Sequence, residues 1–580
     1  NNIYEPVYTN RTANTYSWSY TAVWDHEDSY ATSHQLNWII DQNTFLDIRG
    51  GYVYRYFPII ARPEYAGNYT YYDRKNRVYW GYTSYSDEYW RIRIPFSVWL
   101  TRFQDNFLGA DHEFKAGVEF EQTYYQRDWW RHGNPYYSYW RDFNARNPYY
   151  YSTSGKRGRL RIRYCPGEPG QWKVEDNTRR FSGFVQDNLT AGRLALNLGL
   201  RLDYSYQYEP EQSRPELRYE YGPELLNPEI TNPNALLEAL IADMHAQGLI
   251  SPFDALTTPY KKIVEFLTLS PRVGAVFDVF GDGKTALKAS YARYYEPVWS
   301  AKYNAAQIFG AGSINWYWYD LNGNKLMDLP PVDKYKLTSY PIQDPEYTYY
   351  VEDLKCPYTD EVIVGIEHEL FKDFKLGVQF VRKWTRNIVE DIDMNNGYDP
   401  NARDDKGLIW LPYEVVDPGW DGVFGTDDDQ TITIYGLRED RPVPSWMGTN
   451  PPEAKRDYKA LIITFDKRMS NNWQLKGSIV YSSFKGNAEA TYDPTEGESG
   501  MFDNPNVMIN SYGPLWFDRP LQIKLMGTYV LPYGFIVSAY FQHMSGTPWE
   551  RSLSRVYFPD DAPVQQSYVS INCLLYTSDA

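Results

Sequence analysis

Long apolar runs are missing from this chain of 580 residues. No window approaches the roughly 18 uninterrupted apolar residues that a membrane-spanning helix requires, and residues 1–10 lack the basic and apolar regions of a signal peptide. A helical membrane anchor is therefore not expected. Because the sequence starts with asparagine rather than methionine, we expect a trimmed protein or a fragment.

Cysteine and positive charge are also scarce. The three cysteines, Cys165, Cys356 and Cys573, lie too far apart for a zinc knuckle or a dense disulfide framework. The chain has 58 lysines and arginines against 74 aspartates and glutamates, which gives a formal net charge of −16. Nucleic acid is consequently not expected as a partner.

Aromatic residues, by contrast, make up 18% of the chain, with 56 tyrosines and 20 tryptophans. Mean hydropathy is nevertheless −0.61, so the chain is polar on average. Tyr and Trp rings bury an apolar body while a polar tip stays in water, which concentrates them at membrane–water interfaces.

The strongest pattern is a strict two-residue alternation of apolar and polar side chains. In residues 194–203, one series is Leu194, Leu196, Leu198, Leu200 and Leu202, and the other is Ala195, Asn197, Gly199, Arg201 and Asp203. Residues 46–56, 90–101 and 521–529 repeat the design. A period of two predicts strands with one apolar and one polar face.

The connections between these strands alternate between very short and very long. Tight turns are expected at residues 190–192, 281–283, 372–373, 470–472 and 532–533. Long connections rich in Pro, Gly, Asn, Asp and Tyr are expected at about 205–265, 297–357, 386–456 and 485–517. The short turns therefore gather at one rim of the sheet and the long loops at the other.

This arrangement is typical of an outer-membrane barrel, whose apolar side chains point outward and whose polar side chains point inward. Hydrocarbon offers backbone groups no hydrogen-bond partner, so a sheet crosses a membrane only when it closes on itself. We therefore predict an all-β fold, a partial antiparallel transmembrane β-barrel of about fifteen strands. Residues 234–247 alone show helical spacing, which predicts a short loop helix that packs an apolar stripe.

Several hairpin motifs resemble those of a known family. They are FVQDN at 184–188 followed by LNLGLRLD at 196–203, SPRVG at 270–274 leading through DVFGDGKT at 278–285, GIEHEL at 365–370, DKR at 466–468 ahead of Trp473, and LPYG at 531–534 before SGTP at 545–548. Over about 35–550 the chain resembles the barrel of TonB-dependent outer-membrane receptors. The likeness is greatest to the Oar-like branch, whose full-length members carry an N-terminal carboxypeptidase-regulatory-like domain.

The resemblance implies the barrel portion of a receptor for active uptake, in the outer membrane of a Gram-negative-type bacterium. The nutrient would be large: an oligosaccharide, a peptide or a chelated metal. Polar-face residues such as Arg49, Arg201, Lys288 and Lys476 would contact the family's plug or the passing ligand. The partners implied are outer-membrane lipid, an unidentified extracellular ligand, and the TonB–ExbB–ExbD system, which would act through the missing plug region.

The resemblance also bears on domain organisation. Family members begin with a plug domain and an energy-coupling box, and neither precedes the first barrel strands here. We therefore expect residues 1–580 to form a single truncated barrel domain without the plug or the regulatory-like domain. Barrels of this family have about 22 strands, so about fifteen predict a trough or a distorted closure.

The segments that resemble catalytic motifs each lack a required residue, so no enzyme and no organic cofactor is expected. Gly281-Asp282-Gly283-Lys284-Thr285 looks like the end of a Walker A loop, but Asp278 stands at the leading glycine, and a hairpin turn is the better interpretation. His368-Glu369 lacks the second histidine of a zinc protease helix, because Lys372 occupies that position. No Gly-x-Ser-x-Gly elbow occurs.

Two loops are candidates for structural calcium, because hard cations need several convergent oxygen ligands. The first has Asp320, Asn322, Asn324 and Asp328, and the second has Asp417, Asp421, Asp427 and Asp429. The first is not an EF-hand, since Lys325 stands at the turn glycine. Two solvated turns without metal are the alternative.

The aromatic clusters in the connections are candidates for ligand contact, because flat rings stack on sugars and touch peptides. The candidate residues are Trp129, Trp130, Tyr136, Tyr137, Trp140, Trp316 and Trp318. Packing between loops is the alternative, and we favour it. Cys165 and Cys356 lie in predicted loops, where either a cross-loop disulfide or two free thiols would fit, and we favour free thiols.

Two other protein classes share an alternating strand pattern. A secreted all-β glycan-binding protein or hydrolase would bury the apolar strand faces inside a sandwich or propeller, whereas a barrel turns them outward. A passive porin would show the same barrel without a plug. The direction in which the leucines of 194–202 point therefore separates the first alternative from a membrane barrel.

Overall fold

The computed structural model describes residues 22–24, 28–61, 70–73, 78–81, 86–130, 136–140, 157–164, 173–216, 226–299, 303, 309, 312–324, 326–340, 343–345, 348–419, 421–442, 444–488, 502–559, 562–564 and 568–576. In none of these ranges is there a helix long and apolar enough to cross a membrane.

The dominant element is a 16-stranded sheet in which every pair of strands is antiparallel. Its strands are β1 (Ala22–Trp24), β2 (Asp28–Asp41), β3 (Thr44–Ala61), β6 (Ser86–Phe107), β7 (Ala110–Trp130), β10 (Lys173–Ala191), β11 (Leu194–Glu209), β14 (Lys261–Asp278), β15 (Thr285–Tyr295), β18 (Tyr358–Phe371), β19 (Phe374–Arg386), β26 (Arg456–Ser470), β27 (Trp473–Gly486), β28 (Gly513–Pro514), β29 (Leu521–Val530) and β30 (Ile536–Met544). The predicted all-β antiparallel architecture is confirmed, with sixteen strands where about fifteen were expected.

Short strands in the long connections form seven smaller sheets. They pair β4 (Thr70–Asp73) with β5 (Val78–Gly81), β12 (Gln212–Arg214) with β13 (Leu256–Thr258), β20 (Glu390–Asp393) with β25 (Trp446–Thr449), β21 (Arg403–Asp404) with β22 (Gly407–Leu408), β23 (Trp410–Asp417) with β24 (Gln430–Leu437), β31 (Trp549–Tyr557) with β32 (Tyr568–Tyr576), and join β8 (Tyr136–Trp140), β9 (Arg157–Tyr164), β16 (Gly312–Tyr319) and β17 (Lys334–Ser339). Among the described residues, the helices are α2 (Ala235–Ala246), α3 (Pro505–Met508) and the 3₁₀ turn η3 (Pro532–Gly534).

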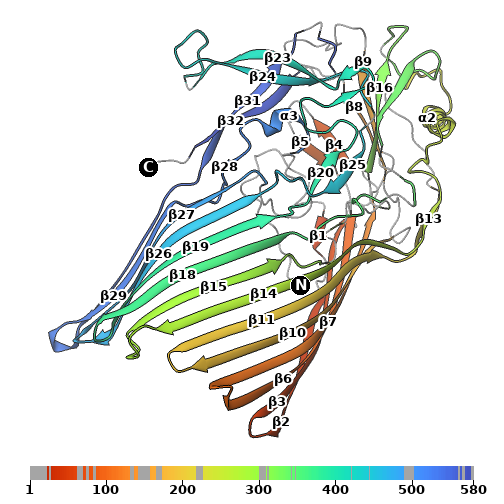
Figure 1. The fold of residues 1–580 in the computed structure, drawn as a ribbon. Coiled ribbons are helices and arrows are strands. Elements are labelled where there is room, and N and C mark those ends of the chain that lie inside the picture. The colour runs from red at the N-terminus through yellow and green to blue at the C-terminus, as the bar shows by residue number, and fades with distance from the viewer. Residues whose placement is uncertain are drawn as a thin grey trace.

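The two rims of the sheet differ as the connection lengths predict. The tight turns lie together at one rim, while the smaller sheets and α2 gather at the opposite rim (Figure 1). At the turn between β26 and β27, Asn471 and Asn472 both have positive φ, at 52° and 66°. Asparagine tolerates this conformation better than most residues, which explains the tight reversal.

The Gly281-Asp282-Gly283 segment is a hairpin turn between β14 and β15, as expected. The Asp278 carboxylate accepts hydrogen bonds from the backbone N–H groups of Gly281 and Gly283, at 3.0 and 2.9 Å. Both glycines have positive φ, which disfavours residues with a Cβ. This segment therefore closes a turn and is not a phosphate loop.

The predicted loop helix is confirmed as α2, one residue shorter at each end. Leu236, Leu237, Leu240 and Met244 are buried along one side of it. They pack with β9 and β16 residues in a compact core on the loop side of the sheet. The helix therefore belongs to the loop structure rather than to the large sheet.

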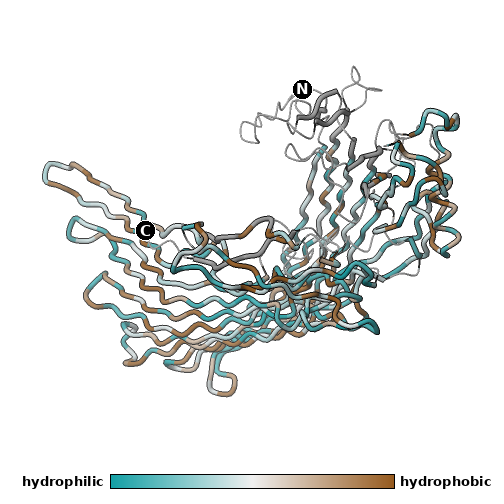
Figure 2. Tube along the Cα trace, turned by 90° about the horizontal axis from the view of Figure 1, so that it is seen from above, coloured by the Kyte–Doolittle hydropathy of each residue, from teal (hydrophilic) through white to brown (hydrophobic). Residues whose placement is uncertain are grey.

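The large sheet is open rather than closed. It runs from β2 and β3 through to β30, and within the described residues no pairing joins β2 to β30. The result is a strongly curved trough (Figures 1 and 2). The expected trough is thus confirmed.

The apolar side chains of the strands face outward. Leu198, Leu200 and Leu202 of β11 are 37%, 44% and 48% exposed, and Val364 of β18 is 51% exposed. They are therefore not the core of a sandwich or propeller, as a secreted all-β protein would require. A continuous exposed apolar band marks a surface that meets lipid.

Leu200→Arg tests this band. We expect the substitution to lower the free energy of unfolding in a lipid bilayer by about 2–4 kcal/mol, because a cation near the centre of the band meets hydrocarbon. Urea titration of the bilayer-inserted chain, followed by tryptophan fluorescence, measures the change.

Asn197→Arg is the matched control, because Asn197 is exposed on the opposite face of the same strand. It should change the free energy of unfolding by less than about 1 kcal/mol. Equal losses for the two variants would show that the leucine face does not contact lipid.

Candidate functional site

The polar face of the large sheet carries charges that are paired within and between strands. The Arg201 guanidinium lies 2.7 Å from Glu119 and 2.9 Å from Asp203. Lys288 Nζ lies 2.8 Å from Glu367. Paired charges of both signs produce a wet surface that holds its side chains in place, which suits contact with a polar partner.

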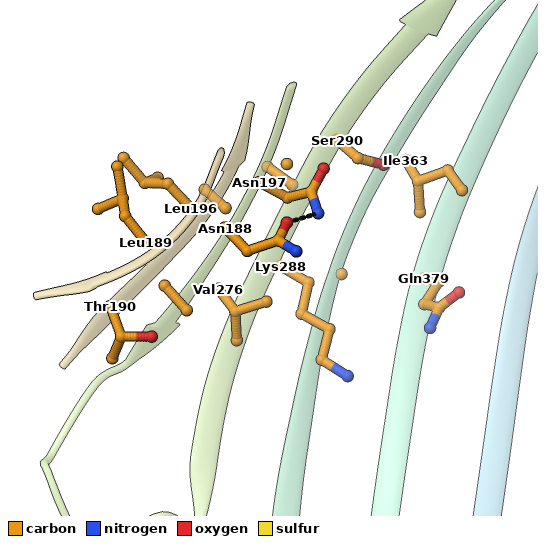
Figure 3. A pocket seen from close by; sticks show the side chains of 15 residues that line it. Asn188, Leu189, Thr190, Leu196, Asn197, Val276, Lys288, Ser290, Ile363 and Gln379 are labelled. Atoms are coloured by element: carbon orange, nitrogen blue, oxygen red, sulfur yellow. Dashed lines mark hydrogen bonds between the residues drawn. The ribbon is translucent and has the colours of Figure 1, made fainter. Parts of the chain in front are cut away.

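Two hollows form on this face. The larger, of about 470 Å³, is lined by the polar residues Asn188, Thr190, Asn197, Lys288, Ser290 and Gln379, by the apolar residues Leu189, Leu196, Val276 and Ile363, and by alanines and glycines (Figure 3). A second hollow, of about 320 Å³, is lined by Lys375, Asp466, Lys476, Lys524, Met526 and Tyr540, among others. Both hollows lie on the polar face, which is the inner, concave side of a barrel wall.

The larger hollow offers amides and hydroxyls from β10, β11, β15 and β19. The Asn197 amide donates to Asn188 Oδ1, and the Asn188 amide donates to Glu113 at 3.2 Å. Small residues such as Gly274 and Gly365 leave the space open. The amides and hydroxyls of this surface suit hydrogen bonding to a polar ligand.

Aromatic rings and cations stack on the concave face of β3, β6 and β7. Arg49 and Lys115 lie 4.6 and 4.9 Å from the Trp99 ring centroid. Arg91 lies 5.9 and 5.6 Å from the rings of Tyr89 and Tyr125. Such stacking holds each cation over an aromatic face while its charge remains available to a partner.

Each of the four basic residues expected on the polar face contacts an acidic or aromatic side chain. Arg201 and Lys288 form ion pairs, Arg49 stacks on Trp99, and Lys476 lies 3.8 Å from Asp466. A role in ligand or plug contact stays a prediction.

Two of the aromatic candidates for ligand contact are buried. Trp316 and Trp318 of β16 are 0% and 3% exposed, and they pack with α2 in the loop core. The Trp318 indole N–H donates to Asp333 at 2.7 Å. These two rings therefore hold the loops together, as the packing alternative expected.

The other aromatic candidates cannot be placed in the same way. The backbones of Trp129, Trp130, Tyr136, Tyr137 and Trp140 belong to β7 and β8, but their side chains lie outside the described part of the structure. Ligand contact by these residues stays a prediction.

The first calcium candidate is a tightly bonded loop after β16. Burial alone would raise the pKa of the Asp328 carboxyl, but amide donors from Asn227, Asn322 and Asn324 outweigh it and hold that pKa below its usual value. Asp320, which is buried, accepts from Gly323 N–H at 2.7 Å. The amide nitrogens, rather than the amide oxygens, of the two asparagines thus face Asp328.

Asp333 belongs to the same loop, and the sequence pattern did not reveal it. It is 1% exposed and accepts hydrogen bonds from the backbone N–H groups of Leu321 and Asp328 as well as from Trp318. Asp333 follows the last predicted ligand by five positions, outside the two-residue spacing that identified the others.

The second calcium candidate, between β23 and β24, gathers carboxylates around a hydroxyl. Thr426 Oγ1 lies 2.8 Å from Asp428, 3.3 Å from Asp429 and 3.4 Å from Asp421. Asp417 instead bonds Gly419 N–H at 3.1 Å, and Asp427 is exposed. Of the predicted residues the fold therefore brings Asp421 and Asp429 together, and adds Asp428.

Calcium binding by the two loops stays a prediction. Across the described ranges, no three His, Cys, Asp or Glu side chains are placed to hold a metal ion. Cys356 is buried, and its thiol lies 3.4 Å from the carbonyl of Glu296 as a hydrogen-bond donor. Cys165 lies outside the described residues, so its pairing with Cys356 stays untested.

A buried pair of carboxylates that the sequence did not reveal lies where β10 and β11 leave the apolar band. Asp176 and Glu209 are 0% and 1% exposed, and they sit one position beyond the cross-strand pair Asn177–Tyr208. Asp176 also lies opposite Tyr125 of β7, and Glu209 lies opposite Lys261 of β14. The pair is on the concave face, at the base of the loop core.

Burial raises the pKa of both carboxyls, and the negative charge of Asp176 raises the pKa of Glu209 further. A hydrogen bond from Gln207 and the charge of Lys261 oppose these shifts only in part. The folded chain therefore retains a proton on this pair at neutral pH, where both carboxyls of the unfolded chain have lost theirs.

The pair makes stability depend on pH. Because the folded state binds more protons than the unfolded state, its contribution is present at pH 4 and is lost as the pH rises through neutral. We expect the melting temperature in detergent micelles to fall between pH 5 and pH 9, and Asp176→Asn to reduce that fall.

Asp405→Asn provides the comparison, because Asp405 is an exposed loop carboxylate. It should leave the pH profile of the melting temperature unchanged. If Asp176→Asn and Asp405→Asn gave the same profile as the parent chain, the buried pair would not be the source of the dependence.

Comparisons with known proteins agree with this architecture. A family model described as an outer membrane beta barrel domain matches residues 7–543. The TonB-dependent transporter Oar of Myxococcus xanthus is 24% identical over 311 residues, which cover 48% of this chain and 26% of that protein. The chain thus spans about a quarter of the length of this curated relative.

Solved structures with similar folds include two bacterial outer-membrane proteins. The outer membrane transporter YddB from Escherichia coli is 15% identical, with a TM-score of 0.49, over 96% of this chain and 56% of that one. The siderophore receptor PiuA from Acinetobacter baumannii is 11% identical, with a TM-score of 0.45, over 95% of this chain and 57% of that one.

Proposed function

Because this chain belongs to the outer membrane beta barrel family and is an outer-membrane protein, we propose that it is the barrel portion of a receptor for active uptake. The receptor would be TonB-dependent and would admit a large polar nutrient: an oligosaccharide, a peptide or a chelated metal. The observation that best supports this proposal is that one sheet has an exposed apolar face and a concave face of paired charges and amides. Binding and passage, rather than bond chemistry, are what these groups can perform.

The residues would divide the task by position. The loops at the long-loop rim would make the first contact with the nutrient, and the concave face would guide it. The hollow around Asn188, Asn197 and Gln379 offers neutral donors and acceptors that suit sugars and peptide groups. The cation–aromatic stacks around Trp99 add flat surfaces beside positive charge.

Energy coupling would come from partners. Similarity to the transporter Oar supports a connection to the TonB–ExbB–ExbD system through a plug region. We propose that residues 1–580 act as one barrel domain in this system. A passive porin differs in one measurable respect, since its flux does not depend on energy.

Energy dependence gives the decisive test. A strain that lacks the gene and a complemented strain are offered fluorescent maltoheptaose, a fluorescent hexapeptide and a ferric catecholate chelate. We expect the complemented strain alone to accumulate one of the three, and an uncoupler of the proton gradient to abolish the accumulation. Accumulation that survives the uncoupler would indicate a porin, and no difference between the strains for any probe would refute the uptake proposal.

We also propose that the two acidic loops bind structural calcium. The convergence of Asp421, Asp428 and Asp429 on one hydroxyl supports this for the second loop, and the ligand spacing supports it for the first. Binding would require the Asn322 and Asn324 amides to turn their oxygens toward the ion.

Hydrogen exchange tests the calcium proposal. Calcium is expected to slow amide exchange in residues 320–333 and 417–430, and a chelator to reverse the effect. Asp421→Asn should abolish the effect in the second loop alone, while exchange in β10 and β11 serves as the internal control. Unchanged protection of both loops on adding calcium would refute the proposal.

A further inference from the structure

Five basic residues crowd the apolar face of the sheet immediately above the lipid-facing band. They are Arg382, Arg386, Lys455, Lys459 and Lys485, here called the basic belt. The strand register places Arg382, Arg386, Lys459 and Lys485 beyond a row of exposed apolar side chains, and Lys455 immediately precedes β26. The row consists of Phe380, Leu461 and Tyr481, which are 47%, 43% and 67% exposed. Arg382 and Lys459 form the next cross-strand pair on the same face.

One carboxylate lies at the centre of the belt. Asp457 is 3.2 Å from the Arg382 guanidinium and 3.1 Å from that of Arg386. Lys485 is the direct cross-strand partner of Asp457. Lys455 stacks on Tyr512 at 5.0 Å, and the Tyr512 hydroxyl donates to Asp457 at 3.2 Å.

The belt is not electrically balanced. Within the residues that the structure describes, Lys455, Lys459 and Lys485 form no ion pair, and Lys459 and Lys485 are exposed. A second carboxylate near Lys485, that of Asp518, is 4% exposed and accepts a hydrogen bond from Phe484 N–H at 3.1 Å. Two of the five cations thus contact Asp457, while the three lysines form no ion pair with a described residue, in a chain whose formal net charge is −16.

Two cations elsewhere above the apolar band on the same face have acidic partners, whereas Arg179 donates hydrogen bonds to Gln122 and Tyr206. Arg293 forms a two-bond pair with Asp360, with both distances 2.8 Å. Lys262 lies 2.5 Å from Glu265. The belt therefore differs from the Arg293 and Lys262 sites, where each cation has its own carboxylate.

We propose that the basic belt binds the phosphate groups of a lipid headgroup in the leaflet on the long-loop side of the outer membrane. The apolar row below the belt contacts acyl chains, so the belt stands at headgroup depth, where phosphates lie. Arginine offers paired N–H donors to phosphate oxygens, and lysine adds a mobile positive charge. The proposal depends on the outer-membrane location and not on the uptake function.

Binding of purified lipid A to the full chain in nonionic detergent micelles tests this, with thermophoresis as the readout. The belt variant carries Lys455→Gln, Lys459→Gln and Lys485→Gln, which leaves the Arg382–Asp457–Arg386 group intact. The matched control variant carries Lys334→Gln, Lys336→Gln and Lys406→Gln, three lysines on the smaller sheets and loops. Inorganic phosphate and a lipid A stripped of its phosphates are the comparison ligands.

We expect the belt variant to bind bisphosphorylated lipid A at least tenfold more weakly than the parent chain, and the control variant to bind it equally well. Dephosphorylated lipid A should bind weakly to all three proteins, and inorganic phosphate should compete only at far higher phosphate concentration. Higher ionic strength should weaken the specific binding, because exposed charges are screened.

Equal affinity of the belt and control variants for lipid A would overturn the proposal, as would equal binding of phosphorylated and dephosphorylated lipid A. Competition by inorganic phosphate at matched concentration would assign the belt to a free anion and would also overturn it. Circular dichroism of each variant in lipid-free micelles shows whether it is folded. Should the triple variant unfold there, Lys485→Gln alone repeats the comparison against Lys336→Gln.

Discussion

Backbone hydrogen bonding between neighbouring strands is the constraint on which the rest of this structure depends. Water cannot satisfy N–H and C=O groups inside a membrane, so the chain must pair them with one another over long antiparallel ladders. Those ladders leave side chains alternating between two faces. The exposed leucines of β11 and the paired charges of Arg201 on the same strand are two consequences of that single requirement.

The two faces then have different energetic tasks. The apolar face gains stability by contact with acyl chains, and the rows of tyrosine and basic residues above it meet headgroups. The concave face is wet, so its charges are kept in position by cross-strand pairs such as Lys288 with Glu367. At the long-loop rim a second, conventional core forms around Trp316 and α2, because those loops project beyond the lipid.

Much of the architecture followed from local pattern. The alternation, the tight turns and the loop helix were read from neighbouring residues, and the structure contains all three. The role of the aromatic clusters could not be predicted in the same way, because a tryptophan in a loop, such as Trp316, can either contact a ligand or pack against other loops. Its burial against Leu236 and Leu240, roughly 80 residues away in the chain, decides for packing. Nothing local to position 316 carries that information.

The sequence by itself determined that strands would alternate and which rim would carry the long loops, because a period of two and a turn residue act over a few positions. Only the tertiary structure decided which distant residues became neighbours. Asp176 and Glu209 form a buried pair, and Arg382, Arg386 and Lys485 meet at Asp457, because strand register aligns segments that lie tens of residues apart. Register is a property of the paired strands together, so neither strand alone could reveal it.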